Sequence, residues 1–196
     1  MLHACCAPCS TVPLQRLTAY EISVFYYGPN IHPRAEYLWR LEEERRLCRQ
    51  WGFPLIEAPY RPAEWGRAIL PHRHLGEGSE RCASCFRLRM RATARVARLQ
   101  GFAAFAVTLT VSPHKNSRVI TRIGSEVAEV EGVVYLAEDF KKQGGFASSL
   151  RWSTELALRR QDYCGCILSR QEAHARRRVG GDFSAAEGPD GCPAAG

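Results

Sequence analysis

Short apolar stretches with strand character alternate along this chain with longer segments whose apolar residues recur at helical spacing. A very short apolar start precedes the first cysteines and predicts a strand. Apolar runs bounded by turn residues predict four more strands, at residues 22–27, 54–58, 102–108 and 132–137. Amphipathic segments between them predict helices at residues 12–20, 33–51, 62–70, 84–99, 117–127, 147–158 and 167–178. This alternation is typical of an α/β domain with a mostly parallel sheet.

The loops that follow the predicted strands carry many of the chemically interesting residues. They span 3–10, 28–32, 109–116 and 138–145, and Ser10 or Thr11 is the expected cap of the first helix. Because the carboxyl ends of parallel strands meet at one edge of a sheet, we expect these loops to open on the same edge. No internal repeat or second domain is visible, so we expect one domain over residues 1–178. The Gly-, Ala- and Pro-rich end, residues 179–196, predicts a disordered tail that contains Cys192.

Length and composition narrow the possible classes of protein. A chain of 196 residues can bury a core without disulfide bonds. No run of about 18 apolar residues indicates a membrane-spanning helix, and the N-terminus lacks a signal-peptide pattern, so we expect a cytoplasmic protein. The formal net charge is +7 and comes almost entirely from Arg. That charge favours a phosphate-binding surface, but a compositional bias of the source organism also explains it, so charge alone does not identify nucleic acid as a partner.

Seven of the nine cysteines fall into three tight groups, which are Cys5, Cys6 and Cys9, then Cys82 and Cys85, then Cys164 and Cys166. Adjacent cysteines make poor structural disulfides, and in a reducing compartment clustered cysteines indicate metal or redox chemistry. Three groups so far apart in the sequence predict one polynuclear metal site assembled by folding. Cys82 and Cys85 are expected at a helix N-terminus, where the helix dipole favours thiolates. Cys48, by contrast, lies late in a predicted helix and is expected to be a half-buried structural thiol.

Other functions remain open on spacing alone. Cys82-x-x-Cys85 fits half of a zinc ribbon, so a zinc-stabilised RNA-binding module is one alternative, although it would use only four thiols. A thiol-based sulfur-transfer enzyme acting on tRNA is another, but the first turn lacks a Gly/Ser-rich phosphate loop. A thiol–disulfide oxidoreductase is a third possibility.

Six ordered motifs carry a resemblance to a known family. HACCAPCS, FYYGPNIHP, ERCASCFRLRM, TLTVSPHKN, EDFKKQGGF and RQDYCGC together resemble epoxyqueuosine reductases of the QueH type over about residues 2–170. The resemblance implies a single α/β domain related to the nucleotide-loop folds (HUP or PP-loop topology), with a Cys-rich site at the C-terminal edge of the strands. It also implies reduction of an epoxide to an alkene, with loss of water, on a modified guanine at the wobble position of tRNA.

The resemblance further implies a [4Fe–4S] cluster beside an additional iron ion, without cobalamin. The implied metal ligands are the seven clustered cysteines, Cys5, Cys6, Cys9, Cys82, Cys85, Cys164 and Cys166. Some members carry Asp where this chain has Cys9, so Cys9 is assigned to the extra metal. The implied partners are tRNA carrying epoxyqueuosine and an unidentified electron donor of the ferredoxin or flavodoxin type.

Candidates for proton transfer and substrate binding follow from the same motifs. The proton donor is left open among His114, Asp139 and Tyr163. The expected substrate-binding residues are Asn30, His32, Ser112, Lys115, Asn116, Arg160 and Gln161. Arg159 stands where the family pattern leads us to expect an aromatic residue. The stripe of Arg87, Arg91, Arg95 and Arg98 is either a solvated helix face or a surface for tRNA phosphates.

Overall fold

The computed structural model describes residues 1–181 and contains a five-stranded sheet in the order β3-β2-β1-β4-β5. All strand pairs are parallel, with Leu2 of β1 opposite Val24 of β2 and Ala106 of β4. The strands are β1 (Leu2–Ala4), β2 (Val24–Tyr26), β3 (Leu55–Glu57), β4 (Ala104–Val107) and β5 (Val134–Tyr135). All five predicted strands and the α/β class are confirmed. The strands β2 to β5 are each shorter than the apolar run that predicted them.

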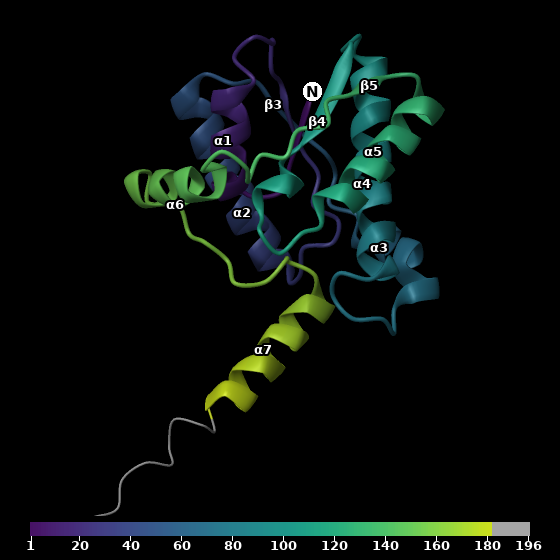
Figure 1. Cartoon of the computed structure of the whole chain (residues 1–196), viewed down its shortest axis with the longest axis vertical. Coiled ribbons are helices and arrows are strands. Elements are labelled where there is room, and N and C mark those ends of the chain that lie inside the picture. Colours follow the sequence, from purple (N-terminus) through teal and green to yellow (C-terminus); the bar gives the residue numbers. More distant parts are fainter. Residues whose placement is uncertain (182–196) are drawn as a thin grey trace, which may run out of the picture.

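Seven helices lie within the described residues (Figure 1). They are α1 (Ala7–Arg16), α2 (Arg34–Trp51), α3 (Pro62–Ile69), α4 (Glu80–Leu99), α5 (Ser117–Glu131), α6 (Gly145–Glu155) and α7 (Ile167–Gly181). Two short 3₁₀ turns cover Leu70–His72 and Thr108–Val111. None of the helices among residues 1–181 has the combination of length and apolar character that a membrane crossing requires. Residues 182–196, with Cys192 and most of the predicted tail, lie outside the described part of the chain.

The first helix begins earlier than the sequence predicted. It starts at Ala7, so Cys6 is its N-cap and Cys9 lies in its first turn. The prediction that Ser10 or Thr11 caps the helix is wrong, since their hydroxyls donate to the carbonyls of Cys6 and Pro8 inside the helix. Helix α4 likewise begins at Glu80, where Ser79 caps it, rather than at residue 84.

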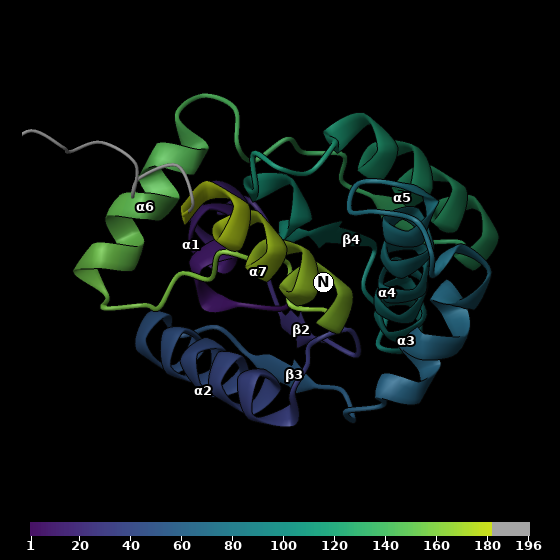
Figure 2. The ribbon, with the colours of Figure 1, turned by 90° about the horizontal axis from the view of Figure 1, so that it is seen from below.

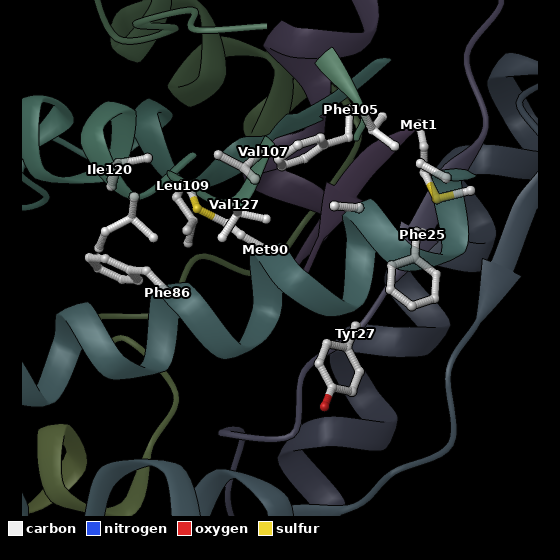
Figure 3. Packing of buried hydrophobic residues seen from close by; sticks show 14 of the residues in the cluster. Met1, Phe25, Tyr27, Phe86, Met90, Phe105, Val107, Leu109, Ile120 and Val127 are labelled. Carbon is white, nitrogen blue, oxygen red and sulfur yellow. The ribbon is translucent and has the colours of Figure 1, made fainter. Parts of the chain in front are cut away.

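Alternate residues of the strands face two different helical layers. Leu2, Ala4 and Val24 pack on the side covered by α1 and α2. Phe25, Phe105 and Val107 point to the opposite side, where they meet α4 and α5 (Figure 3). The second cluster also contains Phe86, Met90, Ile120 and Val127, and each fully buried side chain of this kind stabilises the fold by roughly 1.5–3 kcal/mol. The sheet is therefore covered on both faces.

The strand order creates a switch point in the middle of the sheet. After β1 the chain builds β2 and β3 on one side, and it later returns to the other side of β1 to build β4 and β5. The loops that leave β1 and β4 therefore diverge at the C-terminal edge, which is where open α/β sheets form ligand sites. Figure 2, seen from below the view of Figure 1, shows α7 between the side of α1 and α6 and the side of α3, α4 and α5. The predicted opening of the loops on one edge is confirmed.

Candidate metal centre and substrate pocket

The first thiol group sits where β1 turns into α1. Cys5 and Cys6 are buried and Cys9 is half-buried. The thiol of Cys6 is hydrogen-bonded to those of Cys5 and Cys9. The bond with Cys5 lowers the pKa of Cys6, but the bond with Cys9 and burial outweigh it and raise that pKa to about 12. The same contact with Cys6 lowers the pKa of Cys9.

The second thiol group joins α4 to the start of α7. Cys85 and Cys166 pack in one small cluster with Trp65 and Ile69. Cys82 and Cys164 are half-buried beside them, and the proximity of Cys164 helps to raise the pKa values of Cys82, Cys85 and Cys166. Burial is the largest cause and raises the pKa of Cys85 to about 12. The predicted positions of Cys82 and Cys85 at a helix N-terminus are confirmed.

Backbone N–H groups at the starts of two helices donate to thiols of the second group. The Gly78 N–H donates to Cys82 Sγ at 3.3 Å, just before α4. The Ser169 N–H donates to Cys166 Sγ at 3.3 Å, in the first turn of α7. Cys6 is the N-cap residue of α1, although its side chain accepts no capping hydrogen bond. Three positive helix ends thus favour thiolates at this edge of the sheet.

The thiols of the described residues are not arranged around a common metal position. All eight cysteines in the described residues are free. Cys48 lies outside the site as expected, but it is fully buried among Leu14, Leu47 and other apolar residues rather than half-buried. Within residues 1–181 no group of three or more His, Cys, Asp or Glu side chains is positioned to hold a metal ion. The seven thiols lie near one another as a group of three and a group of four, but neither group surrounds a single metal position.

Two cations, the buried Arg89 and the half-buried Lys115, lie near these groups, and the sequence did not predict their proximity to the thiols. Arg89 of α4 is 1% exposed and faces Cys5, Cys85 and Cys164, one thiol from each segment of the sequence. Burial opposes its charge, but these thiols outweigh burial and raise the pKa of Arg89. Lys115 is affected in the same way by Cys164, Cys9 and Cys5. One signal was available, because Arg89 follows Cys85 by four residues and so shares its helix face.

The segment that carries Cys164 and Cys166 is bound to the loop after β2. The His32 N–H donates to the Gly165 carbonyl at 2.8 Å, and the Tyr163 hydroxyl donates to the His32 carbonyl at 3.4 Å. Arg40 of α2 donates to the Cys164 carbonyl at 3.3 Å. Gly165 has a φ of +121°, and a Cβ there would lie 3.0 Å from the Arg40 guanidinium, so a larger residue does not fit.

A cavity of about 630 Å³ opens beside the thiols. Its lining includes Cys5, Cys6, Cys9 and Cys164, so the first thiol group and one member of the second share a wall with it. Six of the predicted proton donors and substrate-binding residues also line it, namely Ser112, His114, Lys115, Arg160, Gln161 and Tyr163. The volume is in the range typical of small-molecule pockets.

Four predicted site residues are placed elsewhere. Asn116 caps α5, where its side-chain oxygen accepts from the N–H groups of residues 118 and 119 at 3.0 and 3.3 Å. Asp139 pairs with Lys141 at 3.1 Å, and although burial raises its pKa, hydrogen bonds from Ser117 and Lys141 lower it overall. Asn30 is fully buried, and His32 contributes its backbone to the contact with Gly165. These four do not line the cavity.

Three of the four arginines in the stripe on α4 form ion pairs with α5. Arg87 pairs with Glu126 at 2.9 Å, while Arg91 and Arg95 both contact Glu131. The interpretation of the stripe as a tRNA surface therefore loses support. Arg159, the departure from the family pattern, pairs with Glu36 and stacks on the Trp39 ring at 3.9 Å. It does not line the cavity.

Comparison with known proteins supports the resemblance seen in the motifs. A family model described as "Epoxyqueuosine reductase QueH" matches residues 1–172, which include all seven clustered cysteines. The chain is 38% identical over 176 residues to an epoxyqueuosine reductase QueH of Streptococcus pyogenes serotype M1, covering 86% of this chain and 69% of that protein. It is 35% identical over 181 residues to the Thermotoga maritima protein of the same name, covering 89% and 93% of the two chains. The corresponding Acinetobacter baylyi protein is 32% identical over 201 residues, covering 97% and 92%.

Proposed function

Because the chain belongs to the QueH family of epoxyqueuosine reductases, which convert epoxyqueuosine to queuosine in tRNA, we propose that its clustered cysteines hold the metal centre for this reduction. The centre is a [4Fe–4S] cluster with an additional iron ion. The observation that carries the proposal is the shared wall: thiols from both groups line the cavity in which the substrate would bind.

The number and type of the side chains fit such a centre, although the thiols of residues 1–181 are not arranged around a single metal position in this structure. Cys82, Cys85, Cys164 and Cys166 form a group of four, as a [4Fe–4S] cluster requires, and Cys5, Cys6 and Cys9 remain for the iron ion. Arg89 supports the fit, since both of its buried terminal nitrogens lack an oxygen or nitrogen partner within the described residues and face thiols. When bound, the centre supplies single electrons and a Lewis acid for the epoxide oxygen.

The chain itself supplies protons and binds the substrate. Converting the epoxide to an alkene and water consumes two electrons and two protons. Tyr163 and His114 line the cavity and are our candidates for the proton donor, ahead of Asp139, which is paired with Lys141. Lys115 and Arg160 are the cavity cations that we assign to the phosphates of the tRNA.

We further propose a low-potential electron carrier of the ferredoxin or flavodoxin type as the source of electrons. The cytoplasm is the proposed compartment, because tRNA is present there and the described thiols are free rather than paired in disulfides.

The test is anaerobic purification followed by metal analysis, an absorbance spectrum and an assay on tRNA containing epoxyqueuosine. We expect about four to five irons per chain, a broad absorbance band in the visible blue, and formation of queuosine. Cys82→Ser should lose most of this absorbance and the activity. Cys48→Ser, the same change at a buried thiol outside the site, should keep both.

Two outcomes would count against the proposal. Full iron content in Cys82→Ser would refute the assignment of that thiol to the cluster. One zinc and no iron in the wild-type protein would refute the metal centre and favour the zinc-stabilised RNA-binding module.

A further inference from the structure

Arg89 is a buried cation, and no acidic side chain among residues 1–181 forms an ion pair with it. Its side chain contacts β1, where Arg89 Nε lies 3.3 Å from Nε2 of His3. Its two terminal nitrogens have no hydrogen-bond partner within residues 1–181, and Cys5 is the thiol that acts on the guanidinium most strongly. Cys85 and Cys164 are the other groups that act on it electrostatically. The guanidinium therefore stands at the junction of the two thiol groups.

Other buried arginines near the site have carboxylate partners. Arg81 forms two hydrogen bonds to Glu172, at 2.8 and 3.0 Å, and Arg40 pairs with Glu36 at 2.7 Å. The neighbour of Arg89 is instead His3, which is fully buried. An imidazole carries no negative charge, and Nε2 of His3 lies 3.3 Å from Arg89 Nε and 3.0 Å from the Tyr27 carbonyl oxygen. His3 thus orients Arg89 without cancelling its charge.

An unpaired charge of this kind is expensive to bury and persists only where an opposite charge faces it. Metal–thiolate centres carry net negative charge, which grows by one with each electron added. We propose that Arg89 is a positioning residue that compensates the charge of the metal–thiolate centre and raises its reduction potential. This inference rests on the metal centre proposed above. In a water-poor interior a cation this close stabilises the reduced form more than the oxidised form.

The experiment is an anaerobic redox titration of the iron-containing full-length protein, followed by its absorbance. Arg89→Gln removes the charge, Arg89→Lys keeps it, and Arg87→Gln removes an exposed charge from the same helix. We expect the midpoint potential of Arg89→Gln to shift below that of the wild type. Arg89→Lys should recover most of the shift, and Arg87→Gln should leave the potential unchanged.

Urea unfolding of the metal-free chain separates charge compensation from a purely structural role, because the two roles predict opposite effects of Arg89→Gln on the free energy of unfolding. If Arg89 is uncompensated until the metal binds, the metal-free Arg89→Gln chain should be at least as stable as the metal-free wild type. If Arg89 is simply part of the packing, the substitution will destabilise the metal-free chain as well, and this result would overturn the inference.

The remaining outcomes separate the inference from the proposed function. If the wild type and Arg89→Gln both contain iron and have equal midpoint potentials, the inference is overturned while the proposed function stands. If Arg89→Gln retains no iron, Arg89→Lys decides: iron binding with a potential near the wild type supports charge compensation, and loss of iron overturns it. A wild type that binds zinc in place of iron overturns the proposed function and the inference with it.

Discussion

Glu172→Gln tests whether a single ion pair holds the second thiol group in place. Figure 1 shows α7 extending away from the body of the molecule, so its contacts lie near its start. There Glu172 accepts two hydrogen bonds from Arg81 of α4, at 2.8 and 3.0 Å. The Arg81 side chain is 4% exposed and that of Glu172 is 30% exposed. Since Cys166 immediately precedes α7 and Cys82 follows Arg81, this pair links the two halves of the four-thiol group.

The expected cost follows from this geometry. A hydrogen bond between charged groups contributes about 1.5–3 kcal/mol, and the amide of Gln keeps the shape but loses the charge. Local opening of α7 should therefore become roughly tenfold to a hundredfold more frequent, since about 1.4 kcal/mol corresponds to a factor of ten. The consequence for function is faster loss of iron to a chelator.

Hydrogen exchange of the α7 amides measures this opening directly. Glu126→Gln is the matched control, because it breaks an exposed ion pair that α4 makes through Arg87. The side chains of Arg87 and Glu126 are 42% and 46% exposed. Exposed pairs contribute about 1 kcal/mol or less, so this control should leave α7 unchanged. Equal exchange in the two variants would show that the Arg81–Glu172 pair does not anchor α7.

Two further predictions concern protons. Tyr163→Phe should lower the single-turnover rate on epoxyqueuosine-containing tRNA by roughly a hundredfold or more, with little change in binding. The reason is that the phenol lines the cavity and that burial raises its pKa, which keeps it protonated. A larger loss in His114→Asn would assign the proton donor to His114 instead. Glu44 is fully buried and faces Ser10, Cys5 and Glu43, and burial raises its pKa from 4.5 to about 8, so the folded state holds a proton that the unfolded state releases. Stability should fall as the pH rises through this window and level off above it, and Glu44→Gln should flatten the slope of urea midpoints measured from about pH 5 to about pH 9; an identical slope in both proteins would contradict the assignment.

The order and type of the elements could be predicted from the sequence because they depend on local periodicity. Apolar runs marked all five strands, and helical spacing marked the seven helices, with α2 predicted to within one residue of its start. Boundaries were less certain where two local signals competed. Ser10 and Thr11 are good caps in isolation, but β1 ends at Ala4, and the turn at Cys6 begins the helix before they are reached.

The candidate site was predictable only in part, since the thiols could be named but not grouped. Cys164 and Cys5 lie near the same residue, Arg89, although 159 positions separate them, and no local sequence pattern predicts that proximity. Asn116 was taken as a substrate contact because its motif suggested it, whereas the start of α5 uses its side chain as a cap. The arginine stripe looked free because its partners, Glu126 and Glu131, lie on another helix.

The sequence by itself therefore determined the order of strands and helices and the motifs that carry the family resemblance. It also identified seven clustered thiols at the ends of strands and the starts of helices. The tertiary structure decided which of these residues meet. Strand order places β1 between β2 and β4, and this order brings Cys5, Cys85 and Cys164 around Arg89 and opens the cavity beside them. The physical reason is that burial periodicity is a local property of the chain, whereas contacts between elements depend on how the whole core packs.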